Sequence, residues 1–399
     1  MLSLDQVLAQ LLAAVRPLTQ IEEVDTSAAL GRVLAQPLLS LIDVPPHDNA
    51  QMDGYAVRSA DIAAAPCTLP VPLRVAAGQL APPLPARSAA RIFTGAPLPA
   101  GCDAVVMQEN TQAGTGEVTI LQVPPPGQWI RRRGSDLAAG ATALAAGQAL
   151  RPQHLGIAAS VGAARLQVVR RPQVALFCTG DELAMPGEPA APGRIYNSNR
   201  YLLAGLLESL GCRVQDLGIV PDRLAATRAA LAQAAGTADL IVSSGGVSVG
   251  DEDHVKAALA SLGRLDTWQI AMKPGKPLAF GRVGEVPFIG LPGNPVSSFV
   301  TFVLLVRPFL LRSMGIASVR PRAQRLRADF SWKGDAQRRE FLRVRRNDRG
   351  GLDLYPSQNA ALLTSLAWAD GLVDLPAGQA VTPGDSLAFL ALSDLTGPP

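Results

Sequence analysis

Residues 239–254 read DLIVSSGGVSVGDEDH, an apolar run that passes into glycines and is followed at once by three carboxylates. A short, wholly apolar run bounded by turn residues is typical of a strand buried on both faces, as in a parallel sheet. Glycines allow the backbone to approach a ligand closely. The stretch therefore predicts a buried parallel strand that ends in an anion-binding loop, and its carboxylates need a separate explanation.

The sequence on both sides of this stretch repeats a strand–loop–helix pattern. Between residues 171 and 318 the apolar runs lie at 174–183, 212–222, 277–283 and 287–293. Helical segments lie at 197–211, at 223–236, from about Asp253, and at 295–311. This alternation predicts an α/β domain over residues 171–318, with a parallel sheet covered by helices on both faces.

Changes in composition and hydrophobic pattern along the chain predict three further regions. Residues 1–20 form an amphipathic helix that begins with a Ser3-x-x-Gln6 capping box, and residues 135–170 regain helical character. We expect these two segments to pack together as an N-terminal helical module. A β-rich domain is inserted at residues 21–134, where Pro and Gly break short apolar runs. Residues 319–399 alternate without helices and predict a small β-barrel, with a sandwich as the alternative.

The composition narrows the class of protein. A chain of 399 residues is long enough for two to four domains, and its net charge of +3 gives no reason to expect nucleic acid or a membrane as a partner. The four cysteines and three histidines are scattered, which argues against a zinc site or a disulfide framework and favours small buried thiols. The first residues lack the basic start of a signal peptide, and no apolar run looks long enough to span a bilayer. We therefore expect a cytoplasmic protein.

Three loops follow strands of the predicted sheet and have the composition of ligand-binding loops. Ligands of open parallel sheets bind outside the carboxyl ends of the strands, where CTGDE (178–182), SSGG (243–246) and LPGNP (291–295) stand. Glycine turns also occur for packing alone, but three at one sheet edge favour a phosphate site. The candidate substrate-binding residues are Ser244, Gly245, Gly246, Ser248, Pro292, Gly293, Asn294 and Pro295.

A divalent cation explains the carboxylates behind these loops. Two like charges about 4 Å apart repel by roughly 4 kcal/mol at an effective dielectric constant near 20, more than the roughly 0.3–1 kcal/mol that a helix terminus contributes. Mg²⁺ reverses this balance, because it binds one or two carboxylates together with phosphate oxygens. Glu182, Asp222 and Asp253 lie at or just after strand ends and are the candidate Mg²⁺ ligands. Asp253 also suits a helix cap, and the two roles are compatible.

Two lysines on a proline-stiffened loop, AMKPGKP at 271–277, supply positive charge. Solvated surface lysines are the common alternative, but rigid positioning favours an oxyanion role for Lys273, with Lys276 beside it. The loops, acids and lysines together predict phosphoryl-group chemistry with a second anion present. The polar run at 48–56 is either a plain turn or a functional loop. The arginine-rich run at 320–349 is interpreted as a solvated face and not as a nucleic-acid site.

Motifs along the whole chain resemble the MoeA family of molybdopterin molybdenumtransferases, which includes the E domain of gephyrin. They are HDNAQMDGYAV (47–57), IFTGAPLPAGCDAVVMQE (92–109), IRRRGSD (130–136), TGDEL (179–183) with IYNSN (195–199), SSGGVSVGDEDHVK (243–256), MKPGKPLAFG (272–281) and GLPGNPVSS (290–298). The resemblance implies a homodimer of elongated four-domain subunits. In such a dimer the α/β domain of one subunit faces the N-terminal β-rich domain of the other.

The resemblance also implies a reaction and roles for residues. Family members insert molybdate into adenylylated molybdopterin and release AMP with Mg²⁺, and other molybdenum cofactor biosynthesis proteins are possible further partners. By motif, Asp53 and Thr94 reach the site of the partner subunit, with Asp136 nearby. The other implied roles are metal or nucleotide binding for Glu182, Asp222 and Asp253, and molybdate binding for Lys273, Pro292, Pro295 and one of Arg339 and Arg343. Asp251 and Glu252 are expected to face water.

Two positions depart from the family pattern. Gln269 stands where relatives usually have Lys or Arg, and Ala360 where many have Ser. Both are expected near the molybdate end, where Gln269 removes one attractive charge. Two alternative functions are a molybdopterin adenylyltransferase, which needs only the α/β domain, and a non-catalytic scaffold like that of gephyrin. The flanking motifs argue against the first, and the retained acids and Lys273 argue against the second.

Overall fold

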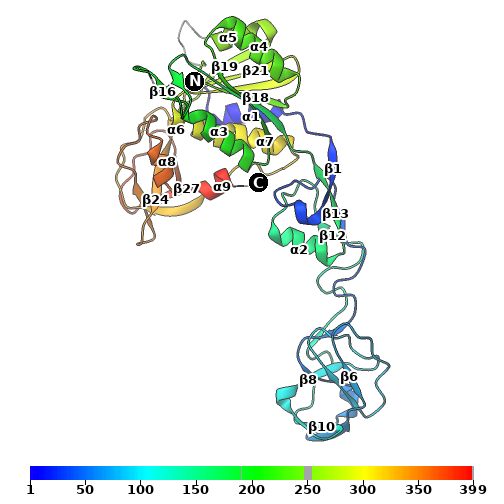
Figure 1. The fold of residues 1–399 in the computed structure, drawn as a ribbon. Helices are drawn as coiled ribbons and strands as arrows, with labels where there is room; N and C mark the ends of the chain where they lie inside the picture. Colours follow the sequence, from blue (N-terminus) through cyan, green and yellow to red (C-terminus); the bar gives the residue numbers. More distant parts are fainter. Residues whose placement is uncertain (190, 247–253, 398–399) are drawn as a thin grey trace.

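The chain folds into a head, a neck and a distal β-domain that follow one another along an elongated molecule (Figure 1). The structure is a computed structural model that describes residues 1–189, 191–246 and 254–397. The head contains residues 1–18 and 171–397, the neck residues 19–44 and 134–170, and the distal β-domain residues 45–133. The neck is therefore built from an outgoing and a returning segment of chain.

The head is built around a six-stranded sheet in the order β17-β14-β18-β22-β21-β19. Its strands are β14 (Gln173–Thr179), β17 (Arg213–Val220), β18 (Leu240–Ser244), β19 (Gly263–Gln269), β21 (Pro277–Val283) and β22 (Val286–Leu291). The first four in this order are parallel, which confirms the predicted parallel-sheet α/β domain. β21 and β19 are antiparallel additions, and β19 was not predicted. Residues 284–285 alone join β21 to β22, and so short a turn cannot connect parallel strands.

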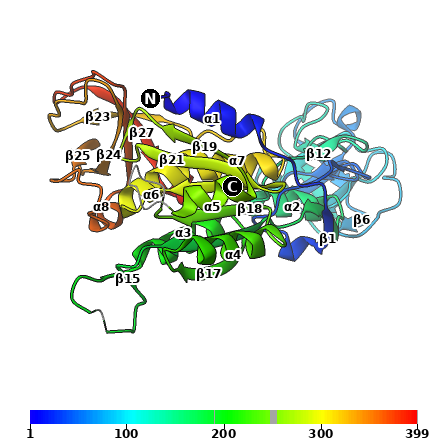
Figure 2. The ribbon, with the colours of Figure 1, turned by 90° about the horizontal axis from the view of Figure 1, so that it is seen from above.

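Helices cover both faces of this sheet, and the alternation of side chains along each strand decides which helix a residue meets. Val174 and Leu176 of β14 pack with α1 (Leu4–Ala13), α3 (Ser198–Ser209) and the helix that begins at Pro295. Residues 175 and 177 pack on the opposite face with α4 (Leu224–Ala235) and α5 (His254–Leu262). Figure 2 shows α1 lying beside the β19 edge of the sheet.

The expectation that the first helix packs against residues 135–170 is wrong. The apolar face of α1 belongs to the core of the head, whereas α2 (Pro152–Ser160) packs in a separate cluster in the neck. The predicted capping box is present, since Gln6 N donates to Ser3 Oγ (3.2 Å) and Ser3 N donates to Gln6 Oε1 (2.8 Å). Leu2 N also donates to Gln269 O (2.9 Å), which ties the start of the chain to the sheet edge.

The neck contains α2 and two short antiparallel strand pairs. β1 (Ile21–Asp25) pairs with β13 (Arg165–Val169), and β2 (Leu38–Leu39) pairs with β12 (Thr142–Leu144). The distal β-domain is an insertion between these segments, as predicted. It begins near Pro45 and not at residue 21, because residues 21–44 pair with the returning chain.

The distal β-domain consists mainly of a four-stranded and a three-stranded sheet, in the orders β6-β7-β4-β8 and β5-β10-β9. The strands are β4 (Gly54–Val57), β5 (Cys67–Pro70), β6 (Leu73–Val75), β7 (Ala89–Ile92), β8 (Ala104–Met107), β9 (Thr111–Ala113) and β10 (Glu117–Ile120). A further pair, β3 (Asn49–Ala50) with β11 (Ile130–Arg131), lies where the domain joins the neck. The two faces of β4 pack in two different apolar clusters, so this strand is buried on both sides.

The C-terminal part of the head is a closed five-stranded barrel, as predicted. Its pairing runs β24-β25-β23-β27-β26 and returns to β24. The strands are β23 (Gln324–Ala328), β24 (Arg339–Arg346), β25 (Gly351–Leu354), β26 (Gly371–Leu375) and β27 (Ser386–Ala391). The tail was expected to lack helices, but α8 (Thr364–Trp368) and α9 (Leu392–Thr396) are present. Helices of five residues are too short to show a hydrophobic period.

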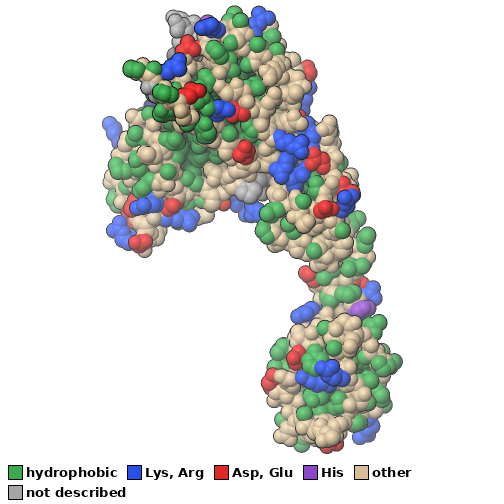
Figure 3. All heavy atoms as spheres, in the orientation of Figure 1, with side chains coloured by type: hydrophobic (Ala, Val, Ile, Leu, Met, Phe, Trp, Pro, Cys, Tyr) green, Lys and Arg blue, Asp and Glu red, His purple; other side chains and the backbone are tan. Residues whose placement is uncertain are grey.

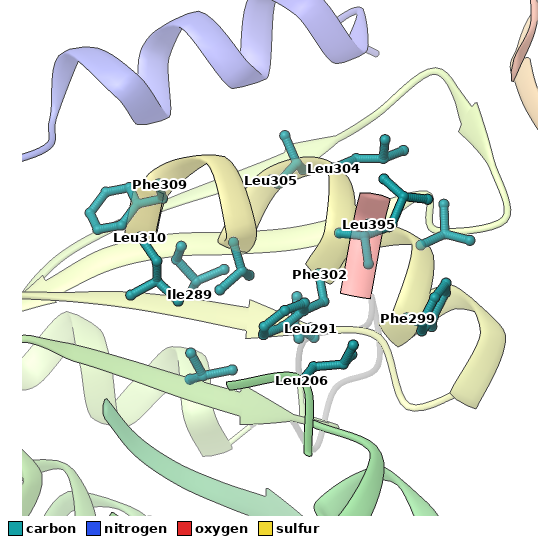
Figure 4. Packing of buried hydrophobic residues seen from close by; sticks show 14 of the residues in the cluster. Leu206, Ile289, Leu291, Phe299, Phe302, Leu304, Leu305, Phe309, Leu310 and Leu395 are labelled. Carbon is teal, nitrogen blue, oxygen red and sulfur yellow. The ribbon is translucent and has the colours of Figure 1, made fainter. Parts of the chain in front are cut away.

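One helix crosses the centre of the head. α6 (Pro295–Thr301), a π-helical turn η4 (Phe302–Val306) and α7 (Arg307–Ser313) form one segment of 19 residues. The expectation that no apolar segment is long enough to span a bilayer is therefore wrong, because this helix has the required length. However, 94% of the helix's most apolar stretch is buried in the protein. Figure 4 shows Phe302 packed near Leu291 of β22, and Leu310 near Ile289 of the same strand. Each such side chain contributes about 1.5–3 kcal/mol when buried, so the helix supplies core stability.

The four cysteines are free thiols. Cys178 and Cys212 are buried, as predicted, and burial raises the pKa of these thiols to about 11 and about 12. Cys67 and Cys102 are only half-buried.

Asp335 organises the loop that enters β24. Its Oδ1 accepts hydrogen bonds from Gln337 N and Arg338 N (both 3.0 Å), and its Oδ2 accepts from Arg338 Nε (2.9 Å) and Nη2 (2.6 Å). The hydrogen bonds from Arg338 lower the pKa of Asp335 to about 2. The fold therefore favours the carboxylate, and this stability is complete above the ordinary pKa near 3.8 and is lost as the pH falls through about 2.

We expect Asp335→Asn to lower the free energy of unfolding by about 1–2 kcal/mol at pH 7, since the charge-assisted bonds are weakened. The difference from wild type should stay constant down to about pH 4 and shrink towards pH 2. Urea unfolding at several pH values measures both effects. Asp348→Asn, at an exposed position of the same barrel, is the control. A deficit that grows on acidification would contradict this role of the carboxylate.

Candidate functional site

A hollow of about 540 Å³ opens at the carboxyl ends of β14, β18 and β22. The starts of α3 and α6 and the loop before α8 complete its wall, and these elements lie together in Figure 1. Six predicted site residues line it: Glu182, Ser244, Gly245, Gly293, Asn294 and Pro295. The position agrees with the rule that open α/β sheets bind ligands beyond their strand ends.

Asn199 joins two of the three loops, SSGG and LPGNP. It lies in the first turn of α3, and its Nδ2 donates to Ser244 Oγ (2.8 Å) and to Gly293 O (2.7 Å). Ser244 Oγ in turn donates to Pro292 O (3.1 Å), which also accepts from Ser298. Segments 45 and 94 residues away in sequence are therefore fixed by one carboxamide.

Two glycines of the SSGG loop are required by backbone geometry. Gly245 has φ +92°, and a Cβ there would lie 2.3 Å from the carbonyl oxygen of Thr179. Gly246 has φ +65°, and a Cβ there would lie 2.5 Å from a methyl group of Val255. Gly246 does not line the hollow, so its role is in packing. Gly293 differs from both, because a Cβ there meets nothing within 4 Å.

Of the three candidate Mg²⁺ ligands, Glu182 and Asp222 lie within the described residues. Glu182 lines the hollow, and its carboxylate oxygens lie within 2.7 Å of where a Cβ on Gly180 would be. Asp222 lies next to Asp181, whose Oδ1 accepts from Asp222 N (3.3 Å), and Asp222 Oδ1 is buried without a partner in the described part of the chain. Asp253 and Ser248 lie outside the described residues, as do Asp251 and Glu252.

These oxygen ligands fit Mg²⁺ better than a softer metal. Within residues 1–189, 191–246 and 254–397 no group of three or more His, Cys, Asp or Glu side chains could hold a metal by itself. Mg²⁺ needs no such group, because it commonly uses one or two carboxylates and completes its shell with phosphate oxygens and water. Glu182 can supply one such carboxylate from the wall of the hollow, whereas Asp222 is not among the residues that line it.

Lys273 lies at the junction of the α/β domain and the barrel. β20 (Met272–Lys273) pairs in parallel with the start of β24. Lys273 Nζ lies 3.0 Å from Glu340 Oε1 and 5.9 Å from the centroid of the Trp332 ring. Glu340 is 2% exposed and also accepts from Trp332 Nε1 (2.8 Å), whereas the Lys273 side chain is 40% exposed. The ammonium group is thus fixed in place and still open to a ligand. The Lys276 side chain is exposed on the same loop.

Neither candidate arginine of the tail lines the hollow. Arg339 is paired with Asp374 through two bonds (2.6 and 2.5 Å) and with Asp5 (3.1 Å). Arg343 is 1% exposed, and burial lowers its pKa to about 10. Its guanidinium donates to Ser365 Oγ (3.2 Å) and to Asn359 O (3.1 Å), beside Ala360. Arg343 therefore supports the loop that delivers Ala361 to the wall of the hollow.

The two departures from the family pattern lie close to these groups. Ala360 O accepts from Val296 N (3.0 Å), which fastens the same loop to the first turn of α6. Gln269 is exposed at the end of β19, just before the AMKPGKP loop.

Asp53 and Thr94 form a unit in the distal β-domain. Asp53 Oδ1 accepts from both Thr94 N and Thr94 Oγ1 (2.7 Å each), and these bonds lower the pKa of Asp53. Arg91 lies nearby, with its guanidinium 4.5 Å from the centroid of Phe93, and Arg74 packs on the same ring at 4.7 Å. Figure 3 shows arginine side chains (blue) gathered on the visible face of this domain, which contains no lysine. Asp136 is exposed in the neck and does not touch this unit, its N donating to Val44 O (3.0 Å).

The distal unit and the hollow lie at opposite ends of the elongated molecule (Figure 1). Asp53, Thr94 and Asp136 therefore lie far from the hollow in the head of the same chain.

Several residues of the site were not among those predicted from sequence. Thr179, Tyr196, Asn197 and Asn199 line the hollow, and Glu340 fixes Lys273. The IYNSN motif was a usable signal for the asparagines, because two Asn residues at the start of a helix exceed what one cap requires. No local signal marks Glu340, since its role depends on the packing of the barrel against the sheet.

Family models match three successive parts of the chain. The MoeA N-terminal region (domains I and II) matches residues 2–162, a probable molybdopterin-binding domain matches residues 175–312, and the MoeA C-terminal region (domain IV) matches residues 325–392.

Several bacterial proteins that are similar to this chain are named molybdopterin molybdenumtransferase. The chain is 44% identical to the molybdopterin molybdenumtransferase of Haemophilus influenzae over 79% of its length and 78% of that protein. It is 39% identical to molybdopterin molybdenumtransferase 2 of Mycobacterium tuberculosis over 93% of its length and 94% of that protein. A solved molybdopterin biosynthesis MoeA protein of Pyrococcus horikoshii, 31% identical, covers 98% of this chain and 99% of its own, with a TM-score of 0.79. These matches agree with the order of motifs and with the arrangement of head, neck and distal domain, and the chain belongs to the MoeA family of molybdopterin molybdenumtransferases.

Proposed function

We propose that this protein inserts molybdenum from molybdate into adenylylated molybdopterin and releases AMP in an Mg²⁺-dependent reaction. The observation that carries the proposal is the convergence of three strand-end loops, with Glu182, on one hollow, where Asn199 joins two of the loops. Its size suits a ligand larger than a simple anion. The two bacterial relatives named above match 79% and 93% of the chain, which supports the same substrates here.

The hollow is the proposed nucleotide end of the site. Gly245 and Gly293 let the backbone approach the phosphate, and Ser244 is held by Asn199. Glu182, Asp222 and Asp253 would hold Mg²⁺, which when bound would supply positive charge to the phosphate. The protein groups would orient the phosphate.

Lys273 is the proposed oxyanion end of the site. Its ammonium group is held by the buried Glu340 and remains half-exposed, so it can attract molybdate without leaving its position. Pro292 and Pro295 stiffen the LPGNP loop in the wall of the hollow. The tail arginines would act here indirectly, because Arg339 and Arg343 are already bound by protein groups.

We expect Glu340→Gln to lower the free energy of unfolding by about 1–3 kcal/mol and to weaken molybdate binding several-fold. Both neighbours of Glu340, Lys273 and Trp332, are hydrogen-bond donors, so the NH₂ group of glutamine must face one of them. Urea unfolding and the molybdate dependence of AMP release measure the two effects. Glu285→Gln, which removes an exposed partner of Arg16, is the control and should change stability by less than about 0.5 kcal/mol. Equal behaviour of the two variants would contradict a positioning role for Glu340.

We also propose that the working form is a cytoplasmic homodimer in which Asp53 and Thr94 of one copy complete the site of the other. The support is the distance between the distal β-domain and the hollow of the same chain (Figure 1). The ionised Asp53 and the arginines on the distal β-domain face are suited to a charged substrate only if another copy brings them to it.

The experiment that tests the function is molybdate-dependent AMP release from adenylylated molybdopterin. We expect release that requires both molybdate and Mg²⁺, together with formation of the molybdenum cofactor. ATP and metal-free molybdopterin should give no adenylate. Adenylate formed from ATP would favour the adenylyltransferase, and no turnover of either substrate would favour the scaffold.

A further inference from the structure

Three strand ends meet at the corner of the distal β-domain that carries Asp53. β4 lies between β7 and β8, with Gly54 paired to Ile92 on one side and to Met107 on the other. A Cβ on Gly54 would lie 1.9 Å from Val106 O, so the strands approach too closely at this point for any side chain. Asp53 directly precedes it, and the place of its backbone therefore depends on how the three strand ends are held together.

Arg91 of β7 joins these strand ends by hydrogen bonds. Its Nη1 donates to Gly54 O (2.9 Å) and to Ile92 O (3.2 Å), and its Nη2 donates to Gln108 Oε1 (2.9 Å) just after β8. Gln108 N in turn donates to Asp53 O (3.1 Å), so the chain of hydrogen bonds returns to Asp53. The protein thus uses three of the five N–H donors of one guanidinium at this corner.

Aromatic rings hold the Arg91 guanidinium further. Arg91 lies opposite Tyr55 in the pairing of β4 with β7, and its guanidinium lies 5.4 Å from the centroid of that ring. The Phe93 ring is 4.5 Å away, and Arg74 packs on the same ring at 4.7 Å. In the described part of the chain no hydrogen bond joins Arg74 to the corner. Of the two arginines on Phe93, Arg91 is therefore the one that is bound to the strand ends.

We propose that Arg91 is the positioning residue of the distal unit, because it holds the backbone that carries the Asp53 carboxylate through Gly54 and Gln108. This rests on the proposed function, in which Asp53 of one copy acts in the site of the other. Arg91 acts without touching the substrate, since its guanidinium is engaged with protein groups. The hydrogen bonds from Thr94 lower the pKa of Asp53, and the positive charge of Arg91 adds to this effect.

Arg91→Gln tests the proposal in steady-state assays of AMP release. A glutamine has one NH₂ group and no charge, so it cannot replace three N–H donors directed at three oxygens. We expect kcat to fall about 10-fold or more, because a displacement of about 1 Å in an active site costs up to about 100-fold. The KM for adenylylated molybdopterin should stay within about 2-fold. A raised KM with unchanged kcat would show that Arg91 binds the substrate and would overturn the positioning role.

Subunit mixing shows whether Arg91 acts on the same side of the shared site as Asp53. Arg91→Gln mixed with Lys273→Ala should recover about a quarter of wild-type activity, because the second variant supplies an intact distal β-domain to the head of the first. Arg91→Gln mixed with Asp53→Asn should stay at or below the activity of Arg91→Gln alone, since every distal β-domain is then defective. Recovery in this second mixture would contradict the proposal.

The double variant Arg91→Gln/Asp53→Asn separates positioning from a general structural role. If Arg91 acts through the Asp53 carboxylate, its loss should add less than about 2-fold to the effect of Asp53→Asn. Additive losses would show that the two residues act independently and would overturn the proposal. Gln108→Ala keeps the test decisive if Arg91→Gln folds poorly. It removes one partner of the same guanidinium and should lower kcat in the same way but less, and an unchanged kcat would contradict the proposal.

Arg171→Gln in the head is the matched control. Arg171 is half-buried, and its Nη1 donates to a backbone oxygen, Gly211 O (3.0 Å), so this variant also removes a bond from an arginine to the main chain. It should keep kcat within about 2-fold of wild type. Urea unfolding of both variants shows that the assays measure folded protein.

Failure of the proposed function gives a different pattern. A wild-type protein that releases no AMP would reject the proposed function and this role of Arg91 with it. Normal release by wild type, a loss in Asp53→Asn and no loss in Arg91→Gln would reject the role of Arg91 alone.

Discussion

Gly245→Ala is expected to lower the free energy of unfolding by about 3 kcal/mol and to abolish phosphate binding in the hollow. An L-residue at φ +92° is strained, and the new methyl group would lie 2.3 Å from the backbone oxygen of Thr179. Neither partner can move freely, because Thr179 ends β14 and Gly245 N donates to Leu291 O (3.2 Å) at the end of β22. Relief of the contact requires the strand ends to separate, and the hollow loses its shape. Urea unfolding and AMP binding measure the two effects.

Two further glycine variants separate the backbone strain of a positive φ from the collision of the new methyl group. Gly218→Ala carries the strain of a positive φ (+74°) but no collision, so it should cost about 1–2 kcal/mol. Gly293→Ala has neither and should keep its stability within about 0.5 kcal/mol, although it lines the hollow. If Gly245→Ala were as stable as Gly293→Ala, the SSGG loop would have a different backbone from the one described.

Asp53→Asn is expected to reduce AMP release by about 100-fold or more while the free energy of unfolding stays nearly unchanged. Asparagine can still accept both hydrogen bonds from Thr94 through Oδ1, so the loop keeps its geometry. What disappears is the negative charge, which the Thr94 bonds stabilise by lowering the pKa of Asp53. Steady-state rates and urea unfolding distinguish the two effects. A variant that loses activity and stability together would point to a structural role.

Mixing Asp53→Asn with Lys273→Ala tests whether two copies share a site. Each variant alone should be inactive, because every site lacks one of the two groups. After subunit exchange about half of the dimers are mixed, and each mixed dimer has one intact site out of two, so about a quarter of wild-type activity should return. Mixtures of either variant with itself serve as controls. If activity did not return although subunit exchange was confirmed, Asp53 and Lys273 would have to act within the same chain.

Much of this fold could be predicted from local patterns. The strand–loop–helix repeat identified the α/β domain, because apolar strands and capped helices follow short-range rules. The positions of Ser244, Gly245 and the LPGNP loop at one edge followed from the parallel order of β14, β18 and β22. Even the antiparallel β21 was accessible in principle, since a two-residue connection excludes a parallel pair.

The neck and the first helix could not be predicted in the same way. β1 pairs with β13 about 140 residues later, and nothing near Ile21 indicates that partner. The apolar face of α1 shows that it must be buried, but periodicity does not say whether the head or the neck buries it.

The sequence by itself determined the family to which the chain belongs and where the glycine loops and the carboxylates stand along it, because these depend on residue type and order along the chain. Only the tertiary structure decided that Asn199 joins Ser244 to Gly293, that Glu340 holds Lys273, and that Arg343 is buried under the loop at 357–361. Each of these contacts unites segments that are distant in sequence. At such a place a polar side chain is needed to pair the hydrogen-bonding groups that are left over once the elements have packed. Which groups are left over depends on the packing, and not on the residues next to that side chain in the sequence.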